Sequence, residues 1–497
     1  MESAGLRRQH RTQRQSSGPM EQRDRNSSHT ANGRKPSSDP PIPAVLARFS
    51  DRQPGFFPPK FTVDLSLPPE QRYAHVAPHF LPHLATAQLS DLFDDLVRDL
   101  VPDRVTSRLV LLAAPLLLRR LYSDEETAEL RGIAAATGLS MHHLVAFNVL
   151  LDLLLGCTSG AARVVFDEDD KYRRLSSASP SPSRLLHFRT LDWGMDPLRH
   201  LVVELDYVQG GAGRAGANPF VVATSVTYFG YVGVLTGVRR GLSLSLNFRP
   251  HHDTSTLRKA LAFRWHQLLV VLGRRRSVSS TLRQYLLSPT AGSTPPGQQV
   301  RDRSHNKPDE HADVQVDVDQ SIREAETARI IDELSSSPST AAYIFLCTPQ
   351  RAYSVEKDHR AASIATSETF LTVCNHDVAD EEVPESGSPS LANAAHHLEE
   401  IDATTGMGSI VAYSVTRKDH VARLFEEAVE RRRRLRQQQQ LLPLPPSSVG
   451  KAVLVKDVLK MVQDPSVSNE ETHFAAIMDP MTGRVLWRRA YLPGDIE

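Results

Sequence analysis

Hydrophobic positions are sparse at the start of the chain and become periodic only after about residue 52. The first 52 residues are rich in Arg, Gln, Ser and Pro. Such a composition cannot bury enough apolar surface to offset the entropy of ordering, so we predict a disordered tail over 1–52. The first patterned segment, FTVDLSLPPEQRY at 61–73, alternates apolar and polar residues before two prolines. This alternation predicts a β-strand.

The following hundred residues have a helical period. Apolar residues recur at intervals of three and four over 87–98 and 124–155, which places them on one face of a helix. Ser140 is a candidate N-cap for the last helix before Gly156. The stretch LVLLAAPLLL at 109–118 is about half of the roughly 20 residues that a membrane span needs, and Pro115 interrupts it. We interpret it as a buried helix of the core.

Beyond Cys157 the pattern indicates a mixture of strands and helices. Helices are predicted at 256–272 and at IREAETARIIDEL. Runs of β-branched and aromatic residues bounded by Gly and Pro predict strands, namely LLHFRTLDWG, HLVVELDYVQ, NPFVVATSVTYFGYVGVLTG, LSLSLNFRP, AAYIFLCTP, ETFLTVCNHD, HFAAIMDP and RVLWRRAYL. Polar tracts near 288–319, 379–391 and 431–448 predict disordered insertions. The last tract contains RRRRLRQQQQLLPLPPSS, which we interpret as a solvated helix end.

Charge and cysteine content exclude several function classes. Lys plus Arg equals Asp plus Glu at 58 each, so the overall charge gives no reason to expect a nucleic-acid partner. The three cysteines lack the paired spacing of a zinc site and are too few for a disulfide framework, and we expect no metal and no cofactor. The N-terminus does not read as a secretory signal, and no segment reads as a membrane helix, which makes the cytoplasm the default location.

The residues that indicate chemistry are Gly156-Cys157-Thr158-Ser159, a small polar cluster between a helical and a β-rich region. A cysteine is ordinarily a buried packing residue. Here the motif HFRTLDWG follows about thirty residues later, and a set of further motifs follows in order. The whole set, rather than the cysteine alone, favours a catalytic site.

These motifs resemble the acid ceramidase and N-acylethanolamine acid amidase family, within the choloylglycine-hydrolase group of N-terminal-nucleophile enzymes. The similarity covers most of the chain from about Phe57, outside the insertions. It is carried by FTVDLSLPPEQRY, FNVLLDLLLGCTS, LLHFRTLDWG, YFGYVGVLTG, LSLNFRP, FLTVCNHD and HFAAIMDPMTG. The resemblance implies an α+β protein with a four-layer αββα fold, two stacked antiparallel sheets between helices. It further implies a mostly helical N-terminal segment, 53–156, and a hydrolase core, 157–497.

The resemblance also implies that the precursor cuts itself between Gly156 and Cys157 and that the two fragments stay associated. Cys157 then has both a thiol and a free α-amine, whose pKa must be tuned before the amine relays the thiol proton. Asp192 is expected to accept hydrogen bonds from that amine. Arg189 is expected beside the thiolate, where it lowers the thiol pKa, or beside the substrate carbonyl. A surface ion pair is the alternative for Arg189 and Asp192.

Three further residues match family positions. Asn247 and Asn375 correspond to positions near the developing oxyanion, where an amide donor stabilises the tetrahedral intermediate; structural turn asparagines are the alternative. Arg417 corresponds to an arginine that supports the site, with a solvated helix arginine as the alternative. Phe248 stands where the family commonly has an acidic residue. Cysteines that link the two subunits in the lysosomal enzymes have no counterparts here, which puts a lysosomal or vacuolar location in doubt.

The function implied is an amidohydrolase of linear amides that acts on an N-acylated lipid. Ceramide is the first substrate, because the N-terminal segment resembles that branch, and N-acylethanolamines are the second. Transient contact with a membrane surface is the accompanying expectation. An inactive homologue that acts as an interaction scaffold is the rival from a different class, and bile-salt-like or penicillin-like amides are a third hypothesis.

Overall fold

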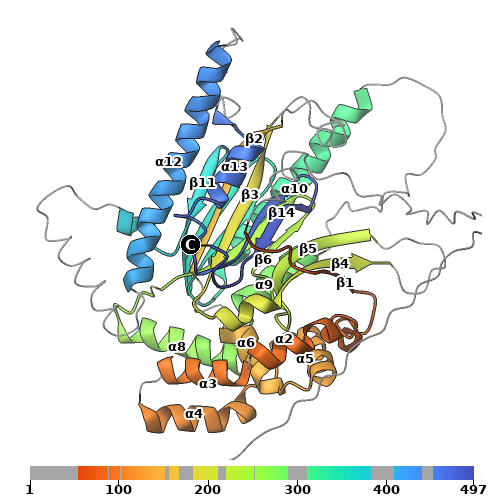
Figure 1. Ribbon diagram of the computed structural model, residues 1–497, viewed down its shortest axis with the longest axis vertical. Helices are drawn as coiled ribbons and strands as arrows, with labels where there is room; N and C mark the ends of the chain where they lie inside the picture. The colour runs from red at the N-terminus through yellow and green to blue at the C-terminus, as the bar shows by residue number, and fades with distance from the viewer. Residues whose placement is uncertain are drawn as a thin grey trace, which may run out of the picture. The chain divides into compact units, whose positions relative to one another are not determined.

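The computed structural model describes residues 54–87, 89–100, 103–150, 156–166, 183–210, 220–250, 252–288, 310–381, 408–438 and 451–496. Within these residues the strands form two sheets, with helices packed on the outer face of each (Figure 1). The predicted tail, 1–52, lies outside the described residues, as do most of the predicted insertions.

The larger sheet has eight strands in the order β1-β4-β5-β6-β7-β8-β9-β10. Every pair is antiparallel except β1 with β4, so the predicted FTVDLSLPPEQRY strand adds to one edge in parallel. The strands are β1 (Lys60–Asp64), β4 (Val202–Gln209), β5 (Phe220–Tyr228), β6 (Thr236–Arg239), β7 (Leu242–Phe248), β8 (Ala342–Cys347), β9 (Ala352–Asp358) and β10 (Ala361–Ser367).

The second sheet has six strands in the order β11-β2-β3-β13-β14, and β12 pairs with β2 in parallel. Its strand β2 begins at Gly156, so Cys157 is the second residue of the strand. The strands are β2 (Gly156–Val165), β3 (Ser183–Asp192), β11 (Phe370–Val373), β12 (Val453–Leu454), β13 (Thr472–Asp479) and β14 (Arg484–Ala490).

The sheets stack face to face, which buries both faces of the central strands. Every residue of β3 is buried. Leu186 and Phe188 pack on one face against α12 (Gly408–Gln438) and α13 (Val455–Val462). Alternation along the strand then points His187 and Arg189 to the other face, between the sheets. The helices α9 (Val278–Leu287) and α10 (Glu310–Ser336) cover the larger sheet, which completes four layers, and the predicted α+β, αββα fold is confirmed.

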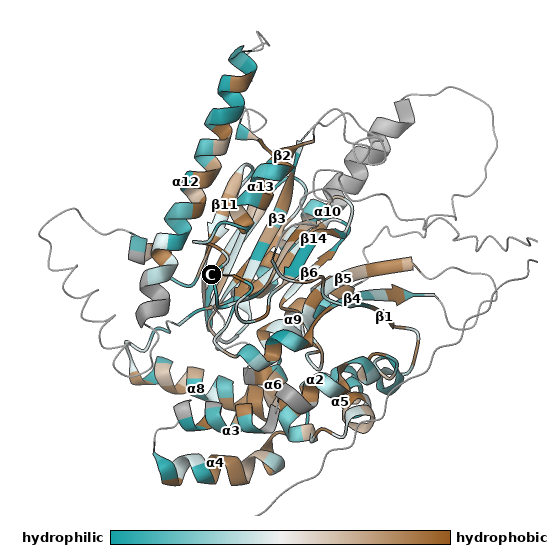
Figure 2. Ribbon diagram, viewed as in Figure 1, coloured by the Kyte–Doolittle hydropathy of each residue, from teal (hydrophilic) through white to brown (hydrophobic). Residues whose placement is uncertain are grey.

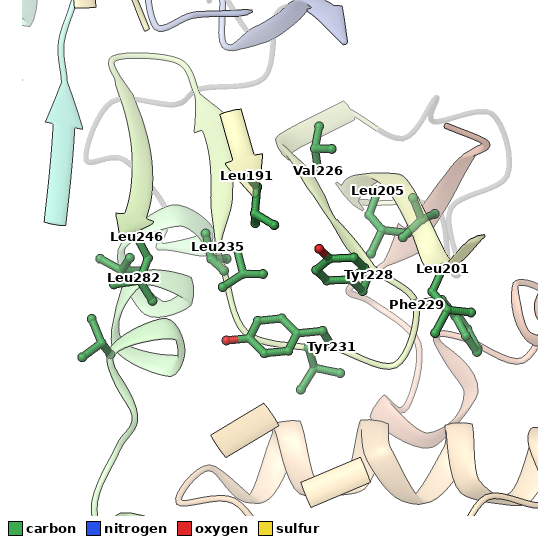
Figure 3. Packing of buried hydrophobic residues seen from close by; sticks show 14 of the residues in the cluster. Leu191, Leu201, Leu205, Val226, Tyr228, Phe229, Tyr231, Leu235, Leu246 and Leu282 are labelled. Carbon is green, nitrogen blue, oxygen red and sulfur yellow. The ribbon is translucent and has the colours of Figure 1, made fainter. Parts of the chain in front are cut away.

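The N-terminal segment supplies helices that close one end of this core. They are α2 (Ala77–Ala87), α3 (Leu89–Leu100), α4 (Arg104–Leu117), α5 (Asp124–Thr137) and α6 (Met141–Leu150), and α8 (Leu257–Val271) packs beside α6. Short 3-10 helices are η1 (Pro69–Gln71), η3 (Asp196–Leu201) and η4 (Val378–Glu381). Figure 3 shows Leu191, Tyr228 and Leu246 in the core that both sheets share.

The prediction that LVLLAAPLLL is a buried core helix is wrong. The segment forms most of α4, but Leu109, Leu112 and Leu116 are 60%, 75% and 64% exposed. The reason is positional, since α4 packs on α3 and α6 and lies outside the sheets (Figure 1). Within α4 only Ser107 and Ala114 are buried. An apolar run on an outer helix is therefore exposed, and Figure 2 shows the hydrophobic colouring of α4.

Helices also extend into two of the predicted insertions. The tract 288–319 is helical from Glu310, because α10 begins there. The arginine run at 431–434 lies within α12, which continues to Gln438. Arg434 pairs with Glu430 one turn earlier, the kind of contact that supports an exposed helix. Strands β9 and β10 and helix α13 were not predicted; the exposed edge strand β10, AASIATS, has no apolar alternation to reveal it.

No helix among the described residues is long and apolar enough to cross a membrane. The same residues contain no cluster of three or more His, Cys, Asp or Glu suited to a metal ion.

Candidate active site

Cys157 lies at the start of β2 with its side chain fully buried between the two sheets. Its Sγ is 3.1 Å from Arg189 Nη2, which donates to it, and 3.9 Å from the carbonyl oxygen of Leu246. Cys157 and Ser159 are two residues apart and so share one face of β2, the face toward β7. The strand alternation thereby brings a thiol and a guanidinium together.

Arg189 is held by a complete set of contacts on its two terminal nitrogens. Nη1 donates to Ser159 Oγ at 2.9 Å and to Asn247 Oδ1 at 2.6 Å. Nη2 donates to the Leu246 carbonyl oxygen at 2.7 Å as well as to the thiol. A planar guanidinium fork with contacts on both arms keeps one orientation, so its charge is fixed beside Sγ.

Burial raises the pKa of the Cys157 thiol to about 11, and the charge of Arg189 opposes this shift. With this pKa, the thiol of the continuous chain is protonated at neutral pH. The nucleophilic form is the thiolate, so the protonated sulfur is unreactive. Arg189 alone does not offset the desolvation, and a proton acceptor is required for the sulfur to react. The α-amine that cleavage would release is such an acceptor.

The backbone nitrogen of Cys157 is bound by Asn375. The Cys157 N–H donates to Asn375 Oδ1 at 2.7 Å, and Asn375 Nδ2 donates to the Phe248 carbonyl oxygen at 2.7 Å. Arg417 Nη2 donates to the same Asn375 oxygen and to the Cys157 carbonyl oxygen, both at 3.3 Å. Asn375 therefore contacts the atom that would become the α-amine.

Asp192 lies opposite Gly156 in the β2–β3 ladder. It forms an ion pair with Arg417 and accepts a 2.7 Å hydrogen bond from Thr472 Oγ1. Burial raises the pKa of Asp192, and the Arg417 charge opposes the shift. The expected contact from the Cys157 nitrogen is thus made to Asn375 in the continuous chain, while Asp192 holds Arg417.

Asn247 ties three strands together. Its Nδ2 donates to the carbonyl oxygens of Cys157, Val373 and Cys374 at 3.4, 3.1 and 3.2 Å. Its amide nitrogen therefore donates to backbone carbonyl groups in the continuous chain.

The structure brings all six predicted residues into one connected network, which consists of Cys157, Arg189, Asp192, Asn247, Asn375 and Arg417.

A family model described as the beta subunit of N-acylethanolamine-hydrolyzing acid amidase matches residues 56–122. Rat acid ceramidase is 30% identical over 206 residues, which span 38% of this chain and 45% of that protein. The Caenorhabditis elegans N-acylethanolamine-hydrolyzing acid amidase is 30% identical over 141 residues, 26% of this chain and 33% of that protein. Part of the chain is thus similar in sequence to acid ceramidases and to an N-acylethanolamine-hydrolyzing acid amidase. It matches less than half of the length of these relatives.

A solved structure of the C. elegans N-acylethanolamine-hydrolyzing acid amidase ortholog aligns with 65% of this chain and 93% of its own, at 16% identity and a TM-score of 0.33. A score this low adds nothing to the fold assignment, which rests on the two sheets and their helices.

Two further residues of the network, Ser245 and His187, lie within the quoted motifs but were not predicted as site residues. Ser245 Oγ donates to Ser159 Oγ at 2.7 Å, and His187 Nε2 lies 2.9 Å from Ser245 Oγ. Burial lowers the pKa of His187 well below its usual value, so the ring is neutral. The sequence did contain a signal, because His187 is two residues before Arg189 and so shares its face of β3. These side chains support the Arg189 contacts from the far side.

A second buried histidine, His473, supports the DWG end of the site. His473 Nε2 is 2.8 Å from the Trp193 carbonyl oxygen, and Nδ1 is 2.8 Å from the Tyr228 hydroxyl. A carbonyl only accepts, so Nε2 carries the proton and Nδ1 accepts from Tyr228. Desolvation, followed by the charge of Arg199, lowers the pKa of His473 to about 3.

This shift predicts a loss of stability in acid that depends on His473. Below the unfolded pKa of about 6.5, the unfolded chain binds a proton that the folded chain rejects, so stability present above that pH is lost as pH falls. Between pH 7 and 4.5 we expect the free energy of unfolding to fall about 2 kcal/mol more in the native chain than in His473→Gln. Urea unfolding of both at the two pH values measures this difference. Equal losses in the two proteins would contradict the assignment.

Proposed function

We propose that this chain is an amidohydrolase that cuts itself between Gly156 and Cys157 and then hydrolyses the amide of an N-acylated lipid, with ceramide as the first substrate. The observation that carries the proposal is the fixed contact between Arg189 Nη2 and Cys157 Sγ at 3.1 Å, at the start of a strand. The similarity to acid ceramidases over part of the chain supports the substrate class.

Self-cleavage is proposed to begin at the sulfur. Cys157 Sγ adds to the Gly156 carbonyl carbon, the carbon–nitrogen bond breaks, and the thiol proton passes to the departing nitrogen, which becomes the α-amine. Water then hydrolyses the thioester, which returns the thiol and leaves a carboxylate on Gly156. The role proposed for Asn375 and Arg417 is to hold the Cys157 nitrogen and carbonyl in place during this exchange.

Hydrolysis of the lipid repeats the same chemistry on a second amide. The α-amine takes the thiol proton, the thiolate attacks the acyl carbon, and the lipid amine leaves with that proton. Water releases the fatty acid from the thioester. Arg189 is proposed to stabilise the thiolate, and the amides of Asn247 and Asn375 are proposed to serve the oxyanion after the cut rearranges their present contacts.

N-acylethanolamine is the second candidate substrate. The family model that matches residues 56–122 describes a subunit of an N-acylethanolamine-hydrolyzing amidase, and a relative from C. elegans has the same description. Incubation of the cleaved protein with ceramide, N-palmitoylethanolamine and a conjugated bile salt, with fatty acid or free acid detected by mass spectrometry, tests both. Release from either lipid amide supports the proposal; release from none of the three, by protein that has cut itself, contradicts it.

The two fragments are proposed to stay associated after the cut. Strand β1 of the first fragment pairs along its whole length with β4 of the second. Lys60 on β1 lies 3.0 Å from Glu204 and 2.7 Å from Asp206. Asn148 of α6 donates to the Gly230 carbonyl oxygen and accepts from the Val232 N–H, both at 2.8 Å. Sheet pairing and buried contacts thus cross the cut.

The proposed membrane contact would use α4 and α8, which both pack on α6. Exposed apolar residues form one stripe on each helix, at spacings of three and four: Val105, Leu109, Leu112 and Leu116 on α4, and Leu257, Leu261, Trp265 and Leu268 on α8. Neither helix contains Asp or Glu, and both carry basic residues. Apolar stripes with basic neighbours are typical of helices that lie on an anionic membrane surface.

We expect Leu112→Asp with Trp265→Asp to lower partition onto phosphatidylcholine–phosphatidylserine vesicles by about tenfold or more, because two anchors become charged. The matched control is Ile364→Asp with Leu435→Asp, which changes exposed apolar residues on β10 and α12. Sedimentation with vesicles measures the partition. Equal losses in both variants would show that α4 and α8 are not the contact surface.

A further inference from the structure

Three consecutive arginines line a cavity of about 460 Å³ on the outer side of the larger sheet. The cavity lies between the loop after α8, the helix α9 and the C-terminal end of α10, helices that Figure 1 labels. It is separate from Cys157, whose side chain lies between the sheets. Its volume falls in the range of about 300–1,000 Å³ that small-molecule sites occupy.

The guanidinium groups of Arg274, Arg275 and Arg276 lack a close carboxylate partner within the part of the chain that the structure describes. Among the described residues, none of the three forms an ion pair with a carboxylate within 4 Å. Arg275 Nη1 lies 2.9 Å from His266 Nδ1, and burial lowers the pKa of His266 to about 4, so that partner is neutral. The loop therefore places three guanidinium groups without a close ion pair along the cavity.

Neighbouring groups orient one of these arginines. Arg276 bonds to the side-chain oxygen of Gln284, and its Cζ lies 5.2 Å from the centre of the Tyr122 ring. Directly after it, Ser277 caps the N-terminus of α9 by accepting from the Ser280 N–H at 3.2 Å. The positive end of the helix dipole thus adds to the arginine charges on the same wall.

The remaining walls mix apolar residues, among them Leu334 and Ile344, with hydroxyl-bearing ones and carry little charge. Thr281 and Tyr285 face the cavity from α9, and Ser337 faces it from the end of α10. Glu333 is the one carboxylate among the lining residues, and it pairs with Arg329 at 3.4 Å on its own helix. The lining thus keeps an excess of positive charge together with hydroxyl groups suited to oxygen atoms of a ligand.

We propose that this cavity is a binding site for a phosphate monoester, with Arg274, Arg275 and Arg276 as the groups that bind the phosphoryl oxygens. A phosphate monoester carries nearly two negative charges and three acceptor oxygens, which match several guanidinium donors. The hydroxyl-bearing walls suit a small polar group attached to the phosphate. Such a ligand occurs as a soluble metabolite or as the headgroup of an anionic lipid.

Calorimetric titration of the full chain with glycerol 3-phosphate tests the site, and flotation with phosphatidic acid vesicles against phosphatidylcholine vesicles tests the lipid source. We expect R274Q/R275Q/R276Q to weaken binding of the recognised probe by about tenfold or more. The matched control R431Q/R433Q/R434Q removes the same charge from α12 and is expected to change binding less than about twofold. The exposed single variant R274Q is expected to give a smaller loss in the same direction.

Binding of glycerol 3-phosphate that the cavity variant loses supports a soluble ligand, and binding of phosphatidic acid vesicles alone supports a lipid headgroup. The proposal is overturned when the native chain binds neither probe, or when the α12 control loses as much affinity as the cavity variant. Since the cavity does not include the Cys157 network, self-cleavage in the cavity variant is expected to be unchanged, which separates this test from that of the proposed function.

Discussion

Cys157→Ala is expected to leave a single uncut chain without amidase activity. The sulfur is the atom that would attack Gly156 in the first reaction and the lipid amide in the second, so both reactions depend on it. Loss of a nucleophile ordinarily lowers turnover by a factor on the order of 10³ or more. Gel electrophoresis and intact mass follow the cut, and fatty acid release follows the activity.

The control for this variant is Cys347→Ala, which removes another fully buried thiol, on β8. A small cavity is its main consequence, so we expect cleavage and activity to be retained at close to the native level. Persistent cleavage in Cys157→Ala would mean that a different group attacks the chain. Persistent hydrolysis in that variant would reject the nucleophile even when the cut is lost.

Glu129→Leu is expected to cost about 3–5 kcal/mol of unfolding free energy and to weaken the association of the two fragments. Glu129 is fully buried on α5 and bridges Arg72 at 2.8 Å and Arg283 at 2.7 Å. Arg72 and Glu129 belong to the first fragment, whereas Arg283 belongs to α9 of the second. Removing the carboxylate leaves two arginines buried without this counter-charge.

Urea unfolding of the uncut chain and gel filtration of the cut protein measure the two consequences. Glu125→Leu is the matched control, because Glu125 also pairs with Arg72 but is 54% exposed on its side chain. An exposed pair is worth about 0–1 kcal/mol, so this control is expected to remain close to native stability. A Glu129→Leu protein as stable as the control would show that the buried cluster does not hold the fragments.

The fold class and the six candidate site residues could be predicted from the sequence because its ordered motifs resemble those of a known family, whereas the helical and strand periods alone indicated only a mixture of helices and strands. The strand alternation of LLHFRTLDWG places Arg189 on the inner face of β3, and the β2–β3 ladder sets it opposite Ser159, two residues from Cys157. Partners across strands were harder to predict. No local pattern links Asn375 to the Cys157 nitrogen, since the two are brought together by the pairing of β11 with β2.

Burial was the weaker part of the prediction, because apolar residues mark a core only when another element covers them. Leu112 on α4 is 75% exposed although its stretch is the most apolar of the chain. Conversely, Arg283 and Glu129 are charged yet buried, because each supplies the partner that the other needs. Sequence alone does not show which helix lies outermost, and that depends on how α3, α4 and α6 pack.

The most direct test of the account is intact mass with N-terminal sequencing of the purified protein after incubation at acidic and neutral pH. The account predicts a fragment whose first residue is Cys157, together with a partner fragment that ends at Gly156. A chain that stays uncut under every condition would contradict the N-terminal-nucleophile mechanism and favour an inactive homologue that serves as an interaction scaffold.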